Sequence, residues 1–161
     1  MGIFKRDNLI ASIKFATVEE RVAACENNIA LSDDDYYDVC LLFNAQRYRN
    51  SINKCYYVIY HLCHAAINLE GLSFNDHDTV IQFFNLIYVK ENFVDKSVYK
   101  SIMQLKGARR DKEYKHDMKI PITYEEADEN RKIMDYLRNE VKELIENAVL
   151  SLKSGKINNT Y

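Results

Sequence analysis

Residues 51–70, which read SINKCYYVIYHLCHAAINLE, form the most apolar stretch of the chain with a helical period. The apolar residues recur at spacings of three and four, which places them on one face of a helix. This face consists of Ile52, Cys55, Tyr56, Ile59, Cys63, Ala66 and Leu69. Gly71 follows at the position where a helix commonly ends in a left-handed residue. The stretch therefore predicts a helix that is too apolar to be exposed all round.

Helical periods also dominate the rest of the 161 residues, which include only one Pro and four Gly. Capping boxes at Thr17–Glu20 and Thr123–Glu126 mark two helix starts. Ser32 and Asp95 are the predicted N-caps of two further helices, and we expect His77 to help cap the short helix that follows it. We expect helices over residues 18–30, 32–46, 78–89, 96–115 and 124–153, and a short helix or partly ordered arm over residues 1–16. The predicted class is all-α, with an N-terminal helical extension (1–31), a helical bundle (32–153) and a loose tail (154–161).

The charge of the chain is uneven, although the formal net charge is only -2. Residues 96–119 hold eight basic and three acidic residues, which gives this segment a formal charge of +5. A basic patch of this kind suits a partner that carries phosphate groups. It equally suits a solvated helix that faces the acidic residues of the last helix, so charge alone leaves both interpretations open.

The cysteines and histidines do not form a metal-binding pattern. No CxxC pair is present, so we expect the four cysteines to be small core residues in a reducing compartment. His61 and His64 are three residues apart but have no Cys, Asp or Glu at ligand spacing, and we expect no metal site. Both belong to a polar seam beside the apolar face, which predicts either a hydrogen-bonded layer between helices or a face toward a pocket or second subunit. The seam consists of Asn53, Tyr57, His61, His64 and Asn68.

Residues 106–117, which read KGARRDKEYKHD, put charged side chains where an apolar stripe should continue. The stripe of the preceding turns is Val98, Ile102 and Leu105. At the same pitch it next reaches Arg109, Glu113 and His116. Because an isolated charge is costly to bury, these residues indicate either a functional site or a structural ion pair between Arg109 and Glu113.

Several segments in the same order resemble the small stand-alone HEPN proteins of bacteria and archaea. Residues 42–57 resemble the entry to that family's central helix, which opens with a pair of tyrosines. Residues 76–83 resemble its His-containing loop and short helix. Residues 109–114 resemble a motif of that family in which an Arg is followed, after three intervening residues, by an acidic residue and a Tyr; the acidic residue is Glu here and usually Asp in the family. The family's catalytic Arg precedes a His by four to six intervening residues. Both Arg109 and Arg110 fit that window before His116.

The resemblance implies an antiparallel four-helix up-and-down bundle with an additional N-terminal helix and one short helix, usually as a homodimer. It also implies a metal-independent endoribonuclease without a cofactor, acting as a toxin or defence component on RNA. The implied catalytic residues are Arg109, Arg110 and His116. The implied binding residues are Glu113, Tyr114, His77 and Lys112.

Imidazole and guanidinium groups suit this chemistry. A histidine that titrates near neutrality transfers protons at the RNA 2′-hydroxyl or at the leaving oxygen. An arginine stabilises the charge that develops on the phosphate. The alternative is a non-catalytic HEPN module that binds a nucleotide or a nucleotidyltransferase partner, the latter as its antitoxin. The sequence shows neither a signal peptide nor a membrane-spanning apolar run, so we expect a cytoplasmic protein.

Overall fold

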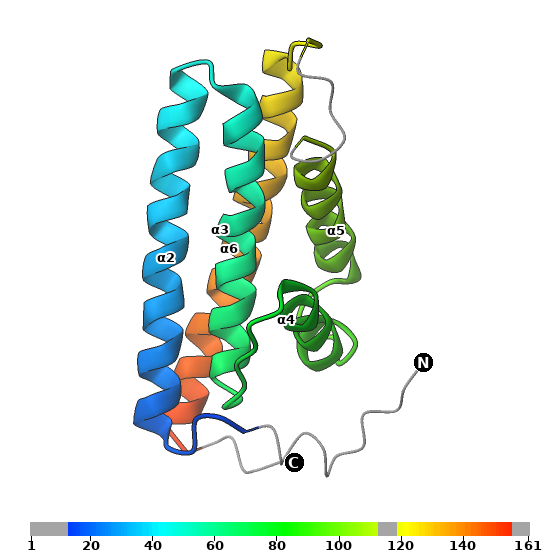
Figure 1. The fold of residues 1–161 in the computed structure, drawn as a ribbon. Helices are drawn as coiled ribbons and strands as arrows, with labels where there is room; N and C mark the ends of the chain where they lie inside the picture. Colours follow the sequence, from blue (N-terminus) through cyan, green and yellow to red (C-terminus); the bar gives the residue numbers. More distant parts are fainter. Residues whose placement is uncertain (1–12, 113–118, 156–161) are drawn as a thin grey trace.

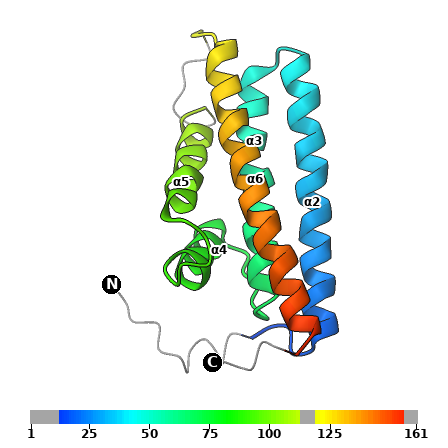
Figure 2. The same ribbon diagram turned by 180° about the vertical axis from the view of Figure 1, so that it is seen from behind.

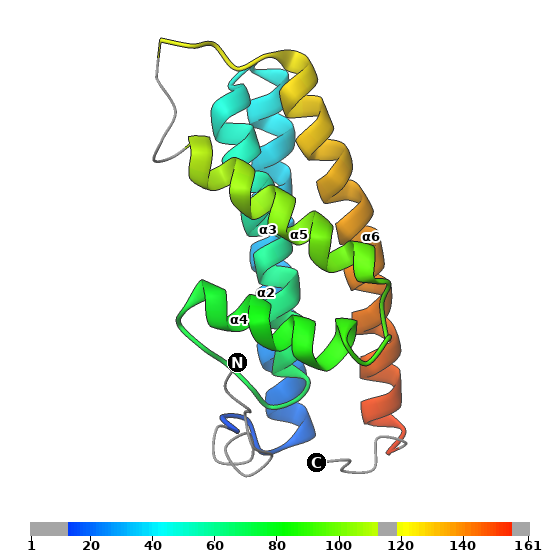
Figure 3. The ribbon, with the colours of Figure 1, turned by 90° about the vertical axis from the view of Figure 1, so that its right-hand side faces the viewer.

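The computed structural model describes residues 13–112 and 119–155, and these residues contain helices and no strand. The elements in chain order are α2 (Val18–Asn44), α3 (Tyr48–Asn68), α4 (His77–Phe84), the π-helical turn η1 (Asn85–Val89), α5 (Lys96–Arg110) and α6 (Tyr124–Lys153). The long helices α2, α3 and α6 pack side by side, with α3 in contact with both others (Figures 1 and 2). Both α4 and α5 cover the remaining side of α3 and cross it obliquely (Figure 3). The predicted all-α bundle is therefore confirmed.

The first long helix, α2, runs without interruption through the break predicted near Ser32. The predicted start is confirmed, because Thr17 and Glu20 form the full capping box. Ser32 is 0% exposed and donates a 2.7 Å hydrogen bond to the carbonyl oxygen of Val58 in α3. The sequence interpretation of Ser32 as an N-cap is wrong because its hydroxyl bonds to the neighbouring helix and not to its own backbone. The helix thus crosses the predicted boundary at residue 31, while the division into extension and bundle stays a prediction.

The second long helix, α3, buries every residue of the apolar face that the sequence predicts, from Ile52 to Leu69. It begins at Tyr48, three residues earlier than expected, after a short turn in which Gln46 has a left-handed φ of 58°. Gly71 has a φ of 84°, which confirms the predicted left-handed residue after the helix. Its carbonyl oxygen accepts hydrogen bonds from the amides of Lys14 and Phe15, so it also fixes the chain that leads into α2.

Replacing Gly71 with alanine is expected to destabilise the fold more than the same change at Gly155. Both glycines have left-handed backbone angles, which cost an alanine about 1–2 kcal/mol. At Gly71 the added Cβ would also lie 2.7 Å from the carbonyl oxygen of Phe15, whereas nothing lies within 4 Å at Gly155. Urea denaturation measures the free energy of unfolding of the two variants. An equal decrease in this free energy at both positions would contradict the steric argument.

The short helical region after Gly71 differs from its prediction in detail. Asp76 is the N-cap of α4 and accepts a hydrogen bond from the amide of Thr79, so His77 is the first helical residue and not a cap. The predicted single helix over residues 78–89 is α4 followed by η1. Asp95 caps α5 as predicted, by accepting from the amide of Ser97. The predicted continuation of α5 beyond residue 112 lies outside the described residues.

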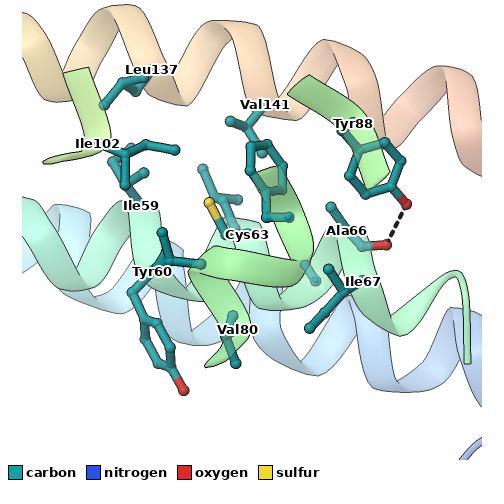
Figure 4. Close-up of a cluster of buried hydrophobic side chains, with 14 of the residues drawn as sticks. Ile59, Tyr60, Cys63, Ala66, Ile67, Val80, Tyr88, Ile102, Leu137 and Val141 are labelled. Atoms are coloured by element: carbon teal, nitrogen blue, oxygen red, sulfur yellow. Dashed lines mark hydrogen bonds between the residues drawn. The ribbon is translucent and has the colours of Figure 1, made fainter. Parts of the chain in front are cut away.

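The last helix, α6, has the predicted bounds, and Thr123 caps it by accepting from the amide of Glu126. The Glu126 side chain, which was predicted to complete a capping box, contacts the ammonium of Lys112 instead. Leu137 and Val141 of α6 meet Ile59 and Ile102 in the core between α3 and α5 (Figure 4). No helix in the described parts of the chain is long and apolar enough to cross a membrane.

The four cysteines are unpaired thiols. Cys25, Cys55 and Cys63 are buried, as predicted, and Cys40 is partly exposed. Burial raises the pKa of the Cys25 and Cys55 thiols to about 12. These thiols are therefore protonated and packed as small core residues at neutral pH.

Candidate functional site

A hollow of about 410 Å³ opens between the start of α4 and the last turn of α5. Its lining consists of Asn75, Asp76, His77, Asp78, Lys106, Arg109 and Arg110. We call this hollow the α4–α5 pocket. Three cations and one imidazole therefore meet where the amide end of a helix also contributes a partial positive charge. Arg109, Arg110 and His77 are three of the residues that the sequence predicted for a site, and the fold brings them together.

Arg109 reaches the pocket from the apolar face of α5. It continues the stripe of buried residues that includes Ile102 and Leu105, as the sequence periodicity predicted. Its guanidinium lies 4.9 Å from the ring centre of Tyr56 and 5.2 Å from that of Tyr57, both on α3. Such cation–π contacts hold the guanidinium in place at the pocket wall. Arg110 is exposed, and no aromatic ring of the described residues contacts its guanidinium.

His77 lies against the same tyrosine-rich face of α3. Its ring stacks on Tyr60 with 3.9 Å between ring centres and 21° between ring planes, and its ring centre lies 5.9 Å from that of Tyr57. Tyr60 belongs to the buried core cluster, and its ring points away from the other labelled side chains (Figure 4). Burial, followed by repulsion from Arg109, lowers the pKa of His77 below its usual value of 6.5. The imidazole is therefore mainly neutral at pH 7.

Tyr56 connects the pocket to the core. The residue is 1% exposed, and its hydroxyl oxygen has no hydrogen-bond partner among the described residues. Burial raises the pKa of this phenol, although the nearby Arg109 guanidinium opposes the shift. A buried hydroxyl without a partner is uncommon and calls for an explanation, such as a ligand or water molecule that it binds.

The two acidic residues of the pocket are both bonded to other groups. Asp78 forms a 2.7 Å ion pair with Lys106. The Asp76 carboxylate accepts hydrogen bonds from the amide and hydroxyl of Thr79. Neither of these two carboxylates forms an ion pair with Arg109 or Arg110.

Comparisons with known proteins place the chain among distant archaeal and bacterial relatives. It is 26% identical over 85 residues to the "UPF0332 protein PH1297" of Pyrococcus horikoshii, covering 53% of this chain and 60% of that protein. It is 25% identical over 121 residues to the "Putative toxin MJ0605" of Methanocaldococcus jannaschii, covering 73% of this chain and 88% of that protein. It is 30% identical over 77 residues to a "UPF0332 protein" of Thermotoga maritima, covering 48% of this chain and 58% of that protein.

The alignments with the two UPF0332 proteins span less than two thirds of those proteins. No protein-family model matches the chain. The relatives fit the small archaeal and bacterial proteins that the sequence resemblance indicates. Their names do not mention a HEPN domain, so this part of the resemblance stays a prediction.

The other predicted site residues lie apart from the pocket lining or outside the described residues. Lys112 follows the end of α5 and does not line the pocket. Its side chain is 11% exposed and forms an ion pair with Glu126 of α6. Its carbonyl oxygen accepts a 3.3 Å hydrogen bond from Arg49 at the start of α3. The Lys112 backbone is therefore bonded to α3 and its side chain to α6. Glu113, Tyr114 and His116 lie outside the described residues, and their roles stay predictions.

The polar seam of α3 divides between its two predicted interpretations: Asn68, His61 and His64 are hydrogen-bonded, whereas Tyr57 contacts the pocket residues Arg109 and His77. Asn68 accepts a 2.8 Å hydrogen bond from Asn28 of α2 and donates to the carbonyl of Leu72. His61 lies 3.4 Å from the Asn28 side-chain oxygen, and His64 lies 3.0 Å from the Ser73 hydroxyl. Among the described residues, no cluster of His, Cys, Asp or Glu is arranged to hold a metal ion.

Lowering the pH from 7 to about 4 is expected to destabilise the protein partly through His64. Burial, followed by repulsion from other cationic groups, lowers the pKa of His64 from 6.5 to about 4. Between these values the unfolded chain binds a proton that the folded chain does not, so stability falls as the pH drops through this window. Urea denaturation at several pH values should show that His64→Gln loses less free energy of unfolding between pH 7 and about 4 than the wild-type protein does. An equal loss in the variant and the wild type would contradict the assignment to His64.

Sequence reasoning missed the two tyrosines that contact Arg109 and the ion pair of the pocket. Tyr56 was assigned to the core and Tyr57 to the polar seam, and neither was connected to Arg109. Lys106 lies one helical turn before Arg109, at a spacing of three that puts both on the same face. That spacing is the sequence signal that could have added Lys106 to the predicted site residues. Its pairing with Asp78 has no such signal, because it depends on how α4 packs against α5.

Proposed function

We propose that this protein is a HEPN-type, metal-independent endoribonuclease that acts on RNA as a toxin or defence component. The observation that carries the proposal is the α4–α5 pocket, where Lys106, Arg109 and Arg110 meet at a helix N-terminus. Backbone amides at such an end and arginine side chains both suit phosphate groups. The distant relative named as a toxin and the sequence resemblance support the same class of function.

In this proposal, Arg109 or Arg110 contacts two oxygens of the scissile phosphate and stabilises the charge that develops there. His116 transfers a proton at the 2′-hydroxyl or at the leaving oxygen, with Glu113 orienting the arginine and Tyr114 and Lys112 contributing to binding. A homodimer would place two such sets of residues at a shared cleft. The reaction joins the 2′-oxygen to phosphorus and releases the 5′-oxygen, which leaves a cyclic phosphate end.

Incubation with single-stranded RNA in EDTA tests the proposal. We expect fragments with 2′,3′-cyclic phosphate ends, and we expect His116→Ala to abolish their formation. His64→Gln is the matched control, because His64 is bonded to Ser73 and does not line the pocket. RNA that stays intact at high concentrations of the wild-type protein would reject the ribonuclease function.

The second candidate is a non-catalytic module that binds a nucleotide or a nucleotidyltransferase antitoxin. The pocket cations suit this candidate as well as they suit the ribonuclease, because Arg109 contacts two tyrosines and Lys106 is paired with Asp78 before any ligand binds. Pre-positioned cations bind a phosphate group whether or not a reaction follows. Thermal stabilisation by a nucleoside monophosphate, together with intact RNA and a stable nucleotidyltransferase complex, would favour this candidate.

A further inference from the structure

His77 is the histidine of the described residues that faces the α4–α5 pocket. It is the first residue of α4, and the Asp76 cap fixes the backbone directly before it. Its position is therefore set by the helix start and not by a long loop. Arg109 and Arg110 approach the same pocket from α5, which packs on α3.

The nitrogens of His77 differ from those of His61 and His64. His61 has side-chain partners in Asn28 and Asp35, and His64 has Ser73. No hydrogen bond connects either ring nitrogen of His77 to the described part of the chain. Its contacts are made by the ring face on Tyr60, which leaves the nitrogens at the ring edge available for a ligand.

Two tyrosines of α3, Tyr56 and Tyr57, contact both His77 and Arg109. The Tyr57 ring centre lies 5.9 Å from the His77 ring centre and 5.2 Å from the Arg109 guanidinium carbon. The Tyr56 ring centre likewise lies 6.3 Å from the His77 ring centre and 4.9 Å from the Arg109 guanidinium carbon. An imidazole and a guanidinium on the same two rings are close enough to contact one phosphodiester and its neighbouring ribose.

We propose that His77 is a second proton-transfer residue for RNA cleavage, supplied by the same protomer that supplies Arg109. This inference rests on the proposed ribonuclease function. A ring nitrogen of His77 takes the proton of the ribose 2′-hydroxyl while the 2′-oxygen forms its bond to phosphorus. The bond from phosphorus to the 5′-oxygen breaks, and the leaving oxygen takes a proton from water. The products are a 2′,3′-cyclic phosphate and a 5′-hydroxyl, and His77 then releases its proton to solvent.

The surroundings of His77 keep it in the form that a base requires. The titratable and charged groups around it are Tyr56, Tyr57, Tyr60, His61 and His64 from α3, Lys106, Arg109 and Arg110 from α5, and Asp76 and Asp78 beside it in sequence. Burial and Arg109 lower the pKa of His77, and the two aspartates raise it by less. The unprotonated fraction at pH 7 is therefore larger than for an ordinary histidine, and we expect activity to fall only as the pH drops below the usual histidine range.

Comparison of His77→Gln with His64→Gln tests the proposal. General acid–base catalysis contributes typically 100- to 10,000-fold, so we expect His77→Gln to lower kcat about 100-fold or more with a smaller change in KM. The acidic limb of the pH–rate profile should also disappear in His77→Gln and persist in His64→Gln. Cleavage by His77→Gln with the rate and pH profile of the wild type would overturn the role of His77 and leave the ribonuclease function standing.

Binding of inorganic phosphate gives a readout that does not depend on cleavage. In the wild-type protein with labelled histidines, we expect added phosphate to shift the nuclear magnetic resonance signals of His77 and raise its pKa, because the anion stabilises the imidazolium. The signals of His64 should stay unchanged. Absence of any His77 shift would overturn its contact with the ligand. Intact RNA with the wild-type protein would instead overturn the ribonuclease function, and with it the proton transfer.

Discussion

Replacement of Arg109 by alanine is expected to lower RNA cleavage on the order of 100- to 1000-fold, the usual cost of removing one group that stabilises transition-state charge. The structure supports this size of effect because Tyr56 and Tyr57 hold the guanidinium at the pocket wall before any ligand binds. Pre-positioned charge stabilises a transition state without further reorganisation. Initial rates on a fluorescent single-stranded RNA, with folding checked by circular dichroism, measure the effect.

Arg131 provides a matched control for this experiment. Its guanidinium lies 4.0 Å from the ring centre of Phe43, but it belongs to α6 and does not line the pocket. Arg131→Ala therefore loses a comparable aromatic contact, and we expect it to retain cleavage. Arg110→Ala should have a smaller effect than Arg109→Ala, because Arg110 is exposed and contacts no aromatic ring in the part of the chain that the structure describes. A larger effect at Arg110 would assign the phosphate contact to that residue.

Replacement of Leu137 by alanine is expected to lower the free energy of unfolding by about 2–5 kcal/mol. Leu137 is 0% exposed and lies where α6 meets Ile59 of α3 and Ile102 of α5 (Figure 4). The substitution removes buried methyl groups and leaves a cavity, because the three helices constrain how far the site can collapse. Urea denaturation measures the loss.

Leu150 offers the same substitution on the same helix in a different environment. Its side chain is 68% exposed, so Leu150→Ala should change the free energy of unfolding by no more than about 0.5 kcal/mol. The two variants have equal changes in helix propensity, and their difference therefore isolates the contribution of burial. Similar losses at both positions would contradict the assignment of Leu137 to the core.

Local sequence signals predicted the helices well where two signals agreed. The bounds of α6 follow from the cap at Thr123 and the glycine at position 155, with an apolar stripe between them. The start of α5 follows from Asp95, whose carboxylate accepts from the second residue of the helix. Such signals concern residues within one turn of each other, so a single sequence contains them.

The break predicted at Ser32 shows where local signals fail. A serine followed by three aspartates is typical of a helix start. In the fold, the Ser32 hydroxyl donates to Val58, and Asp33 pairs with Arg138 and Lys142 of α6. These partners are distant in sequence, so the tertiary contacts that keep α2 continuous had no local signature.

The candidate site was predictable only in part for the same reason. Periodicity placed Arg109 on the packed face of α5, and the family resemblance pointed to His77. The pocket itself arises where α3, α4 and α5 meet, so the stacking of His77 on Tyr60 and the pairing of Lys106 with Asp78 depend on tertiary docking. The unpartnered hydroxyl of Tyr56 likewise becomes visible only once its surroundings are packed.

The short turn over residues 45–47 has a consequence for the order of folding. It joins α2 to α3, and this pair forms the most extensive helix–helix contact of the described chain. Contacts between neighbouring segments form quickly because little chain entropy is lost in closing a short loop. We therefore expect the α2–α3 hairpin to belong to the folding nucleus. The pocket would be acquired late, when α4 and α5 dock, so substitutions there should speed unfolding more than they slow folding.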